Sequence, residues 1–259
     1  MTKKQSKATK QANAQRAAER AAAIRQKQEA KERRRRALVV SASALAVIAV
    51  VVAIAVFVQS SRDTTGQAAT PPDGAVAEYA LPMGPVDAPV EVTVYEDFMC
   101  PYCGLFESVS RDALKEYAAS GDVKVRYHVV SFLDDQSSSE YSTRAANALA
   151  VVLDQAGPEV AVKFHDQLYA NQPEEGGAGL SDQELVDYAV EAGAQEADVA
   201  GPIESRKFEQ WVVNSTGEWS DRGHNGTPTV TVDGETVEFE SAEDLLANTR
   251  SAIESALAE

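Results

Sequence analysis

Alternating and helical patterns of apolar residues predict an α/β domain in the second part of this chain. Residues 90–95 and 123–133 alternate between apolar and polar side chains, which is typical of half-buried strands. Between them, residues 100–121 carry apolar side chains at roughly helical spacing and end at a glycine. Strand, helix and strand in this order predict the beginning of an α/β unit.

A helix-rich block follows the second strand. Ser181 and Glu184 have the spacing of a capping box, and Asp233-Gly234 between two strand-like runs of residues 226–240 predicts a hairpin turn. Helices are predicted over residues 140–157, 158–172, 181–193 and 201–219, and a closing amphipathic helix over residues 241–259. The expected core positions of the block are Leu149, Val152, Leu153, Phe164, Leu168, Leu185, Tyr188, Phe208 and Trp211.

A long apolar run near the N-terminus predicts a membrane span. Residues 37–58 carry no charge, and a helix needs about 20 residues to cross the core of a bilayer. The basic segment KERRRR, residues 31–36, comes directly before the run, and Lys and Arg beside a span stay on the cytoplasmic side. We therefore expect a single transmembrane helix with the N-terminus inside the cell. The alternative is a cleaved signal peptide, which has a shorter charged start, an apolar region of about 7–15 residues and a small-residue cleavage site.

The charge of the chain agrees with this division. The net charge is −16, yet residues 1–36 carry +10 and residues 59–259 carry −26, so the two ends are predicted to lie in different compartments. The basic tail has no aromatic residue to stack on bases, and a basic segment beside a span contacts anionic lipid, so no nucleic-acid partner is expected. Residues 59–77 are small and polar and predict a flexible linker to a domain at 78–259.

Cys100 and Cys103 are the two cysteines of the chain, and their spacing allows several kinds of site. A structural zinc site needs four ligands, and the three histidines do not have the spacing that would complete one. Idle thiols are not expected outside the cell, where such a pair would oxidise. A structural disulfide would close a very short loop and would stabilise the fold little. No metal or cofactor is therefore expected, and a redox pair is favoured over a structural disulfide.

The position of the pair favours unequal roles for the two thiols. Cys100 is predicted at the N-terminus of a helix, where free N–H groups and the helix dipole stabilise a thiolate. Pro101 suits the first helical position, and the amides of Tyr102 and Cys103 can point at the Cys100 sulfur. Cys103 lies one turn further on and is expected to resolve the mixed disulfide. Because a stabilised thiolate stabilises the reduced form, we expect an oxidant of moderate strength.

The segments DAPVEVTVYEDFMCPYCGLFE and GTPTVTVDG together resemble those of the DsbA-like thioredoxin family of extracytoplasmic disulfide oxidoreductases. The resemblance covers about residues 78–259 and implies an α/β thioredoxin fold with a helical domain inserted at about 134–222, preceded here by the single transmembrane helix. It also implies that Thr227-Pro228 is a cis peptide facing the cysteines, where the loop would pair with an extended substrate peptide.

The resemblance also implies site residues beyond the two thiols. Family members often carry an acid six residues before the first cysteine, which is thought to assist proton transfer from the second thiol. Val94 occupies that position here. Asp97 matches a family position, and Glu96 is named only as a weak substitute for the missing acid.

The expected function is oxidation of cysteine pairs in reduced exported proteins by a membrane-tethered enzyme. The resemblance implies reoxidation by a quinone-linked membrane partner. Two alternatives remain: an isomerase or reductase of the same fold, and a tethered binding or chaperone-like module in which the disulfide is only structural.

Overall fold

A computed structural model describes residues 27, 31, 34, 48, 50–52 and 64–258. The chain separates into two units, Met1–Asp63 and Thr64–Glu259. The described positions of the first unit are helical, and the predicted span at 37–58 lies outside the described residues apart from Ile48 and residues 50–52. Within the part of the chain that the structure describes, no helix combines the length and the apolar character that a membrane crossing requires.

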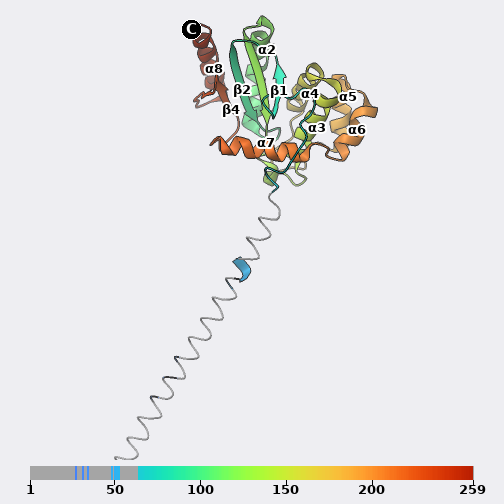
Figure 1. Cartoon of the computed structure of the whole chain (residues 1–259), viewed down its shortest axis with the longest axis vertical. Coiled ribbons are helices and arrows are strands. Elements are labelled where there is room, and N and C mark those ends of the chain that lie inside the picture. The colour runs from blue at the N-terminus through green and yellow to red at the C-terminus, as the bar shows by residue number, and fades with distance from the viewer. Residues whose placement is uncertain are drawn as a thin grey trace, which may run out of the picture. The chain divides into compact units, whose positions relative to one another are not determined.

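The second unit is built on one five-stranded sheet (Figure 1) with the order β1-β3-β2-β4-β5. Strand β2 is parallel to β3, whereas β1, β4 and β5 each pair antiparallel with their neighbours. The strands are β1 (Ala80–Met83), β2 (Val90–Glu96), β3 (Val123–Val129), β4 (Thr229–Val232) and β5 (Glu235–Thr236). The central β2 places its C-terminal end beside the helix that carries both cysteines.

Helices cover the two faces of this sheet. Helices α2 (Pro101–Ser120) and α8 (Ala242–Ala256) pack against each other and against one face. Along β2, Val92 and Val94 belong to the large apolar core, whereas Tyr95 belongs to a small cluster with Trp219 of α7 (Glu209–Asp221). Because side chains alternate along a strand, α7 covers the face opposite to α2.

A helical block lies between β3 and β4 and occupies the interval expected for the inserted helices. Figure 1 shows its helices gathered beside the sheet, with α7 running from this block across to the strands. The interval contains a short 3-10 helix (Asp134–Gln136), α3 (Tyr141–Ala156), α4 (Pro158–Ala170), α5 (Asp182–Ala192), α6 (Glu196–Glu204) and α7. The apolar residues predicted for its core are buried, except that Tyr188 is half-buried.

The main elements that the sequence predicts are present. The strand–helix–strand unit, the capping box of Ser181 and Glu184 and the hairpin at Asp233-Gly234 are confirmed. The helix predicted over residues 201–219 is wrong, because α6 ends at Glu204 and α7 begins at Glu209, with Arg206 between them at a positive φ of 53°. Strand β1 was not predicted, since it is a four-residue edge strand that contains Pro82.

Residues 64–77 differ from the flexible coil that their composition predicts. The Asn214 side chain of α7 accepts a hydrogen bond from the Gly66 amide and donates one to the Gln67 carbonyl, at 2.9 and 2.8 Å. Asp73 donates its amide hydrogen to the Asp154 carboxylate of α3 at 2.9 Å. Side-chain partners on the domain therefore hold this segment, and composition alone cannot indicate them.

Candidate functional site

Cys100 and Cys103 lie at the junction between β2 and α2. Cys100 is the N-cap of α2 in an extended conformation, and Pro101 occupies the first helical turn. The Cys100 amide donates to the Asp97 carbonyl at 2.9 Å, and this bond closes the turn between strand and helix. Both cysteines are free thiols in the structure. The reactive pair is thus held where a helix presents its unpaired N–H groups.

The two thiols differ in accessibility and in acidity. Cys100 retains 4% of its surface and Cys103 none. A hydrogen bond from the Cys103 thiol lowers the pKa of Cys100 to about 6, and Thr227 and the amides of Cys103 and Tyr102 act in the same direction against the effect of burial. Burial and the neighbouring Cys100 raise the pKa of Cys103 well above its usual value. Cys100 is therefore the more acidic and the more accessible thiol of the pair, which is the environment of a reactive cysteine, whereas the surroundings of Cys103 favour its protonated form.

The loop before β4 faces Cys100. The Cys100 thiol donates to the Thr227 carbonyl at 3.3 Å. The Thr227-Pro228 peptide bond is cis, as the resemblance implies. Pro228 is buried and Thr227 is half-buried. A hollow of about 430 Å³ borders the loop, and its lining runs from Gly223 through Pro228 to Phe239. The loop can therefore meet a peptide whose sulfur lies at Cys100.

Asp97 is buried and acts as an acceptor at the junction. Its carboxylate accepts hydrogen bonds from the amides of Met99 and Leu133, both at 2.8 Å, and from the Ser142 hydroxyl at 2.6 Å. Burial raises the pKa of Asp97 to about 7, although these three donors oppose the shift. The residue joins the turn before Cys100 to the start of the helical block, and this contact gives it a positioning role.

Glu96, the last residue of β2, is buried with its side chain on the side opposite to that of its neighbour Asp97, and it contacts the helical block. Its Oε1 lies 2.5 Å from Nε2 of His165 in α4, and both side chains are fully buried. Val94 is also buried, on the same strand face two residues earlier. The structure therefore has a valine at the position of the expected acid and a buried carboxylate one pleat nearer the cysteines.

The structure places three further residues near the pair. Glu107 of α2 is fully buried, and its carboxylate, the Glu96 carboxylate and a His165 nitrogen lie within 4.8 Å of one another. Gln172 donates from Nε2 to the carbonyls of Phe98 and Cys100, at 3.0 and 2.9 Å. Glu107 could have been noticed, because it follows Cys103 by four residues and so shares its helix face. His165 and Gln172 depend on how α4 packs, which the local pattern does not indicate.

The first turns of α2, directly after Cys100, expose two large side chains. Tyr102 keeps 67% of its surface and Leu105 keeps 55%. Both residues belong to the first turns of the helix that Cys100 caps. They offer a contact surface for a partner that reaches the cysteine.

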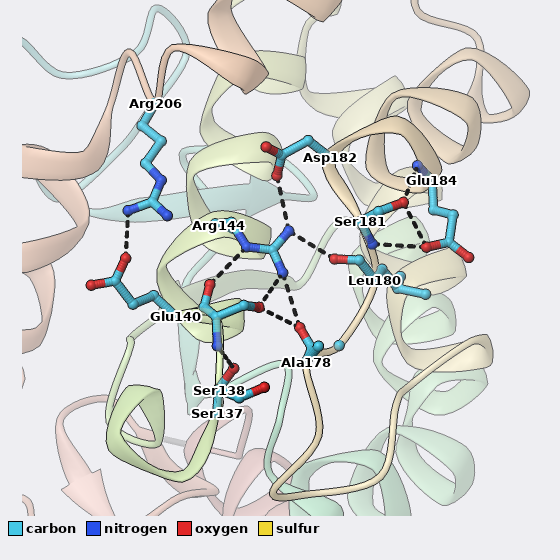
Figure 2. Close-up of a pocket in the computed structure, with 12 residues that line it drawn as sticks. Ser137, Ser138, Glu140, Arg144, Ala178, Leu180, Ser181, Asp182, Glu184 and Arg206 are labelled. Carbon is cyan, nitrogen blue, oxygen red and sulfur yellow. Dashed lines mark hydrogen bonds and ion pairs between the residues drawn. The ribbon is translucent and has the colours of Figure 1, made fainter.

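A separate hollow of about 700 Å³ lies between α3 and α5 (Figure 2). The Arg144 guanidinium fills its floor and donates to the carbonyls of Ser139, Ala178 and Leu180 and to the Asp182 carboxylate. None of the predicted site residues lines it. Because Arg144 is already saturated by protein acceptors, the hollow is a structural junction between the helices.

Comparisons with known proteins agree with this geometry. The thioredoxin family model matches residues 77–249. The reduced disulfide bond oxidoreductase DsbG of Mycobacterium tuberculosis is 30% identical, with a TM-score of 0.58 over 69% of this chain and 92% of that chain. DsbA of the same organism is 29% identical, with a TM-score of 0.57 over 69% of this chain and 98% of that chain.

A match to part of a larger protein was also found. The serine/threonine-protein kinase PknE of Mycobacterium tuberculosis is 36% identical over 112 residues, which are 42% of this chain and 20% of the kinase. The chain thus spans about a fifth of that relative's length. The family match over most of the folded unit and the similarity to nearly all of DsbG show that the chain belongs to the thioredoxin family, in its DsbA-like group of thiol–disulfide oxidoreductases.

Proposed function

We propose that this protein is a membrane-tethered extracytoplasmic oxidoreductase that donates a Cys100–Cys103 disulfide to reduced exported proteins. The contrast between the two thiols carries the proposal. Cys100, with a pKa of about 6, is about nine-tenths ionised at pH 7, whereas Cys103 is buried with a raised pKa. A pair of this kind releases Cys100 readily as a thiolate and keeps Cys103 as a thiol.

The chemistry follows from this contrast. A substrate thiolate attacks the Cys100 sulfur, the Cys100–Cys103 bond breaks, and Cys103 leaves and takes up a proton. The second substrate thiolate then attacks the substrate sulfur of the mixed disulfide, and Cys100 leaves as a thiolate. Its low pKa favours this second step, because the better leaving thiol departs faster.

The roles of the surrounding residues are part of the proposal. Thr227 and Pro228 would align an extended peptide by backbone pairing beside Cys100, and the exposed Tyr102 would contact it. Pro101 would keep the first turn of α2 in place, and Asp97 would hold the turn before it. The hollow beside the loop leaves room for a substrate side chain.

The site of action rests on the sequence. The apolar run at 37–58 and the basic residues before it support a tether with the domain outside the cytoplasm. A quinone-linked membrane protein would return Cys100 and Cys103 to the disulfide, and this partner is inferred from the resemblance alone. Mature protein that begins near residue 60 would instead indicate a cleaved signal peptide and no tether.

An isomerase or reductase of the same fold is the main alternative, and the reduction potential separates the disulfide donor from the reductase. Equilibration with glutathione should give a value well above the roughly −270 mV of thioredoxin and below the roughly −120 mV of the strongest oxidants of this fold. A value as low as that of thioredoxin would exclude the role of disulfide donor and favour a reductase.

A binding module with a structural disulfide is the alternative from another class. Cys103→Ala leaves Cys100 able to attack but removes the thiol that releases the product, so it should accumulate mixed disulfides with exported proteins. The double variant Cys100→Ser with Cys103→Ala is the matched control and should trap nothing. Absence of trapping, together with normal function of Cys100→Ser in cells, would favour the binding module.

A further inference from the structure

We infer that Gln172 is a positioning residue for the reactive thiol. Its side-chain amide holds two carbonyls beside Cys100 and so aims the free N–H groups at the start of α2 at the Cys100 sulfur. The inference rests on the proposed function and extends it, because it names a residue of the inserted block on which the chemistry of Cys100 depends. We call residues 97–100, which join β2 to α2, the redox turn.

The end of α4 delivers Gln172 to the redox turn in a fixed position. The amide hydrogens of Gln172 and of Asn171, the C-cap of α4, are both bonded to carbonyls of the last helical turn, at 3.4 and 3.0 Å. The ring of Tyr169 in the same turn packs on Phe98 of the redox turn, with 5.1 Å between the ring centroids. The Gln172 side chain therefore starts from backbone that is fixed against the redox turn.

The Gln172 amide binds the redox turn at two carbonyls. Its Nε2 donates to the Phe98 carbonyl at 3.0 Å and to the Cys100 carbonyl at 2.9 Å. The Phe98 carbonyl shares a peptide plane with the Met99 amide, which donates to the Asp97 carboxylate at 2.8 Å. Gln172 and Asp97 thus hold one peptide plane of the turn from its two ends, and Gln172 alone extends this hold to Cys100.

The Cys100 carbonyl determines how α2 is oriented relative to the reactive sulfur. This carbonyl shares a rigid peptide plane with the nitrogen of Pro101, and the proline ring fixes the backbone angle φ that follows. The orientation of the carbonyl therefore sets the position of the first helical turn, and of its free amides, relative to the Cys100 side chain. The same carbonyl accepts the first helical hydrogen bond from the Gly104 amide, which at 3.2 Å is longer than the bond from Gln172.

The acidity of Cys100 depends on this alignment. The Cys103 thiol, Thr227 and the amides of Cys103 and Tyr102 lower the pKa of Cys100, against the effect of burial. Hydrogen bonds weaken steeply as they bend, so a small rotation of the redox turn would remove part of this effect. Loss of the Gln172 amide should therefore change the chemistry of the thiol as well as the stability of the fold.

A glycine directly after Cys103 makes the contact with Gln172 possible. A Cβ at Gly104 would lie 2.1 Å from Oε1 of Gln172 and 3.0 Å from its Cδ. Gly104 lies inside α2, where glycine is less stable than alanine, and it is not among the glycines with a positive φ. The backbone conformation thus does not require a glycine here, whereas the close approach of the Gln172 amide does.

The test is the acidity of Cys100 in the reduced full-length protein, followed by thiolate absorbance. Gln172→Met keeps a side chain of similar length but removes both donors. It should raise the pKa of Cys100 by about one unit, the loss expected when one hydrogen bond to the sulfur is misaligned. In equilibrium with glutathione at pH 8, the ratio of reduced to oxidised protein should fall about tenfold, which lowers the reduction potential by about 30 mV.

Ser181→Ala is the matched control for lost stability. It should weaken the fold through the cap of α5, and Ser181 bonds to Glu184 rather than to the redox turn. Cys100 in this variant should titrate as in wild type. If Gln172→Met also titrates as wild type, Gln172 is a structural anchor only and the inference is overturned.

Gly104→Ala reaches the same hydrogen bonds without changing Gln172. It should also raise the pKa of Cys100, and the double variant with Gln172→Met should shift it no further than Gln172→Met alone, because the same contacts are lost. Shifts that add in the double variant would overturn the inference. Oxidation of a reduced peptide by wild type tests the proposed function separately, and its occurrence would leave that function intact whatever the Gln172 variants show.

Discussion

Replacing Gly104 by alanine tests how tightly the helical block holds the redox helix. A Cβ at Gly104 would lie 2.1 Å from Oε1 of Gln172, so the glutamine side chain would have to move. Its Nε2 donates to the carbonyls of Phe98 and Cys100, which flank the strand-to-helix turn. The substitution would therefore break both hydrogen bonds without touching either cysteine.

The magnitude follows from two opposing effects. Alanine in a helix interior is favoured over glycine by about 0.8–1.0 kcal/mol. Each lost hydrogen bond costs about 0.5–1.5 kcal/mol, so the pair costs about 1–3 kcal/mol. We expect Gly104→Ala to lower the free energy of unfolding by about 0–2 kcal/mol.

The assay is urea unfolding of the reduced protein at one pH, and it compares Gly104→Ala with wild type. In a Gln172→Ala background the clash is absent, so adding Gly104→Ala to this variant should stabilise it by about 0.8–1.0 kcal/mol. If Gly104→Ala stabilises the protein by the same amount whether or not Gln172 is present, Gln172 does not form its hydrogen bonds to the turn and the reasoning is refuted.

Three further predictions concern the site and its supports. The thiolate absorbance of Cys100 should titrate with a midpoint of about pH 6. Because this pKa lies below the ordinary value, the stability that the thiolate gives the reduced form should be complete above about pH 9 and should be lost as the pH falls through 6. A midpoint above 8 would contradict the assignment. Asp97→Asn should lower the free energy of unfolding in urea by about 1–3 kcal/mol, because one of the three donors to this carboxylate loses its acceptor. A decrease of less than 0.5 kcal/mol would show that the Asp97 carboxylate is not needed to hold the turn. Ser181→Ala should lower the free energy of unfolding by about 1 kcal/mol through loss of the α5 cap, whereas Ser108→Ala on exposed α2 should change it little, and equal effects would argue against the capping box.

The parts of the fold that the sequence predicts are those governed by local physics. Alternation of valines with polar residues indicates β2 and β3, because a strand exposes its two faces in turn. Ser181 and Glu184 indicate the start of α5, because the cap is made by residues three apart. The Cys100 position at a helix N-terminus follows in the same way from the strand and helix on either side of it.

The parts that the sequence does not predict depend on contacts between distant segments. The Asn214 side chain holds residues 66 and 67 from more than a hundred positions away, which no local pattern records. The partner of Glu96 is His165 on an inserted helix, and a histidine in mid-helix carries no sign of that pairing. The break between α6 and α7 at Arg206 interrupts a continuous helical pattern, because the chain there turns with a positive φ.

The attachments of Glu96 and Asp97 make the inserted helices inseparable from the sheet. These neighbouring residues of one strand end are both fully buried, and each finds its partner in the inserted block, at His165 and Ser142. Excision of the helices to leave a minimal thioredoxin core would remove the partner of Glu96 and would leave the Asp97 carboxylate with the Met99 amide as its donor. Buried carboxyl groups that lose their partners are strongly destabilising. The inserted helices are thus required to hold the end of the strand that leads to the cysteines. A change in these helices is transmitted to the cysteines through the adjacent residues Glu96 and Asp97.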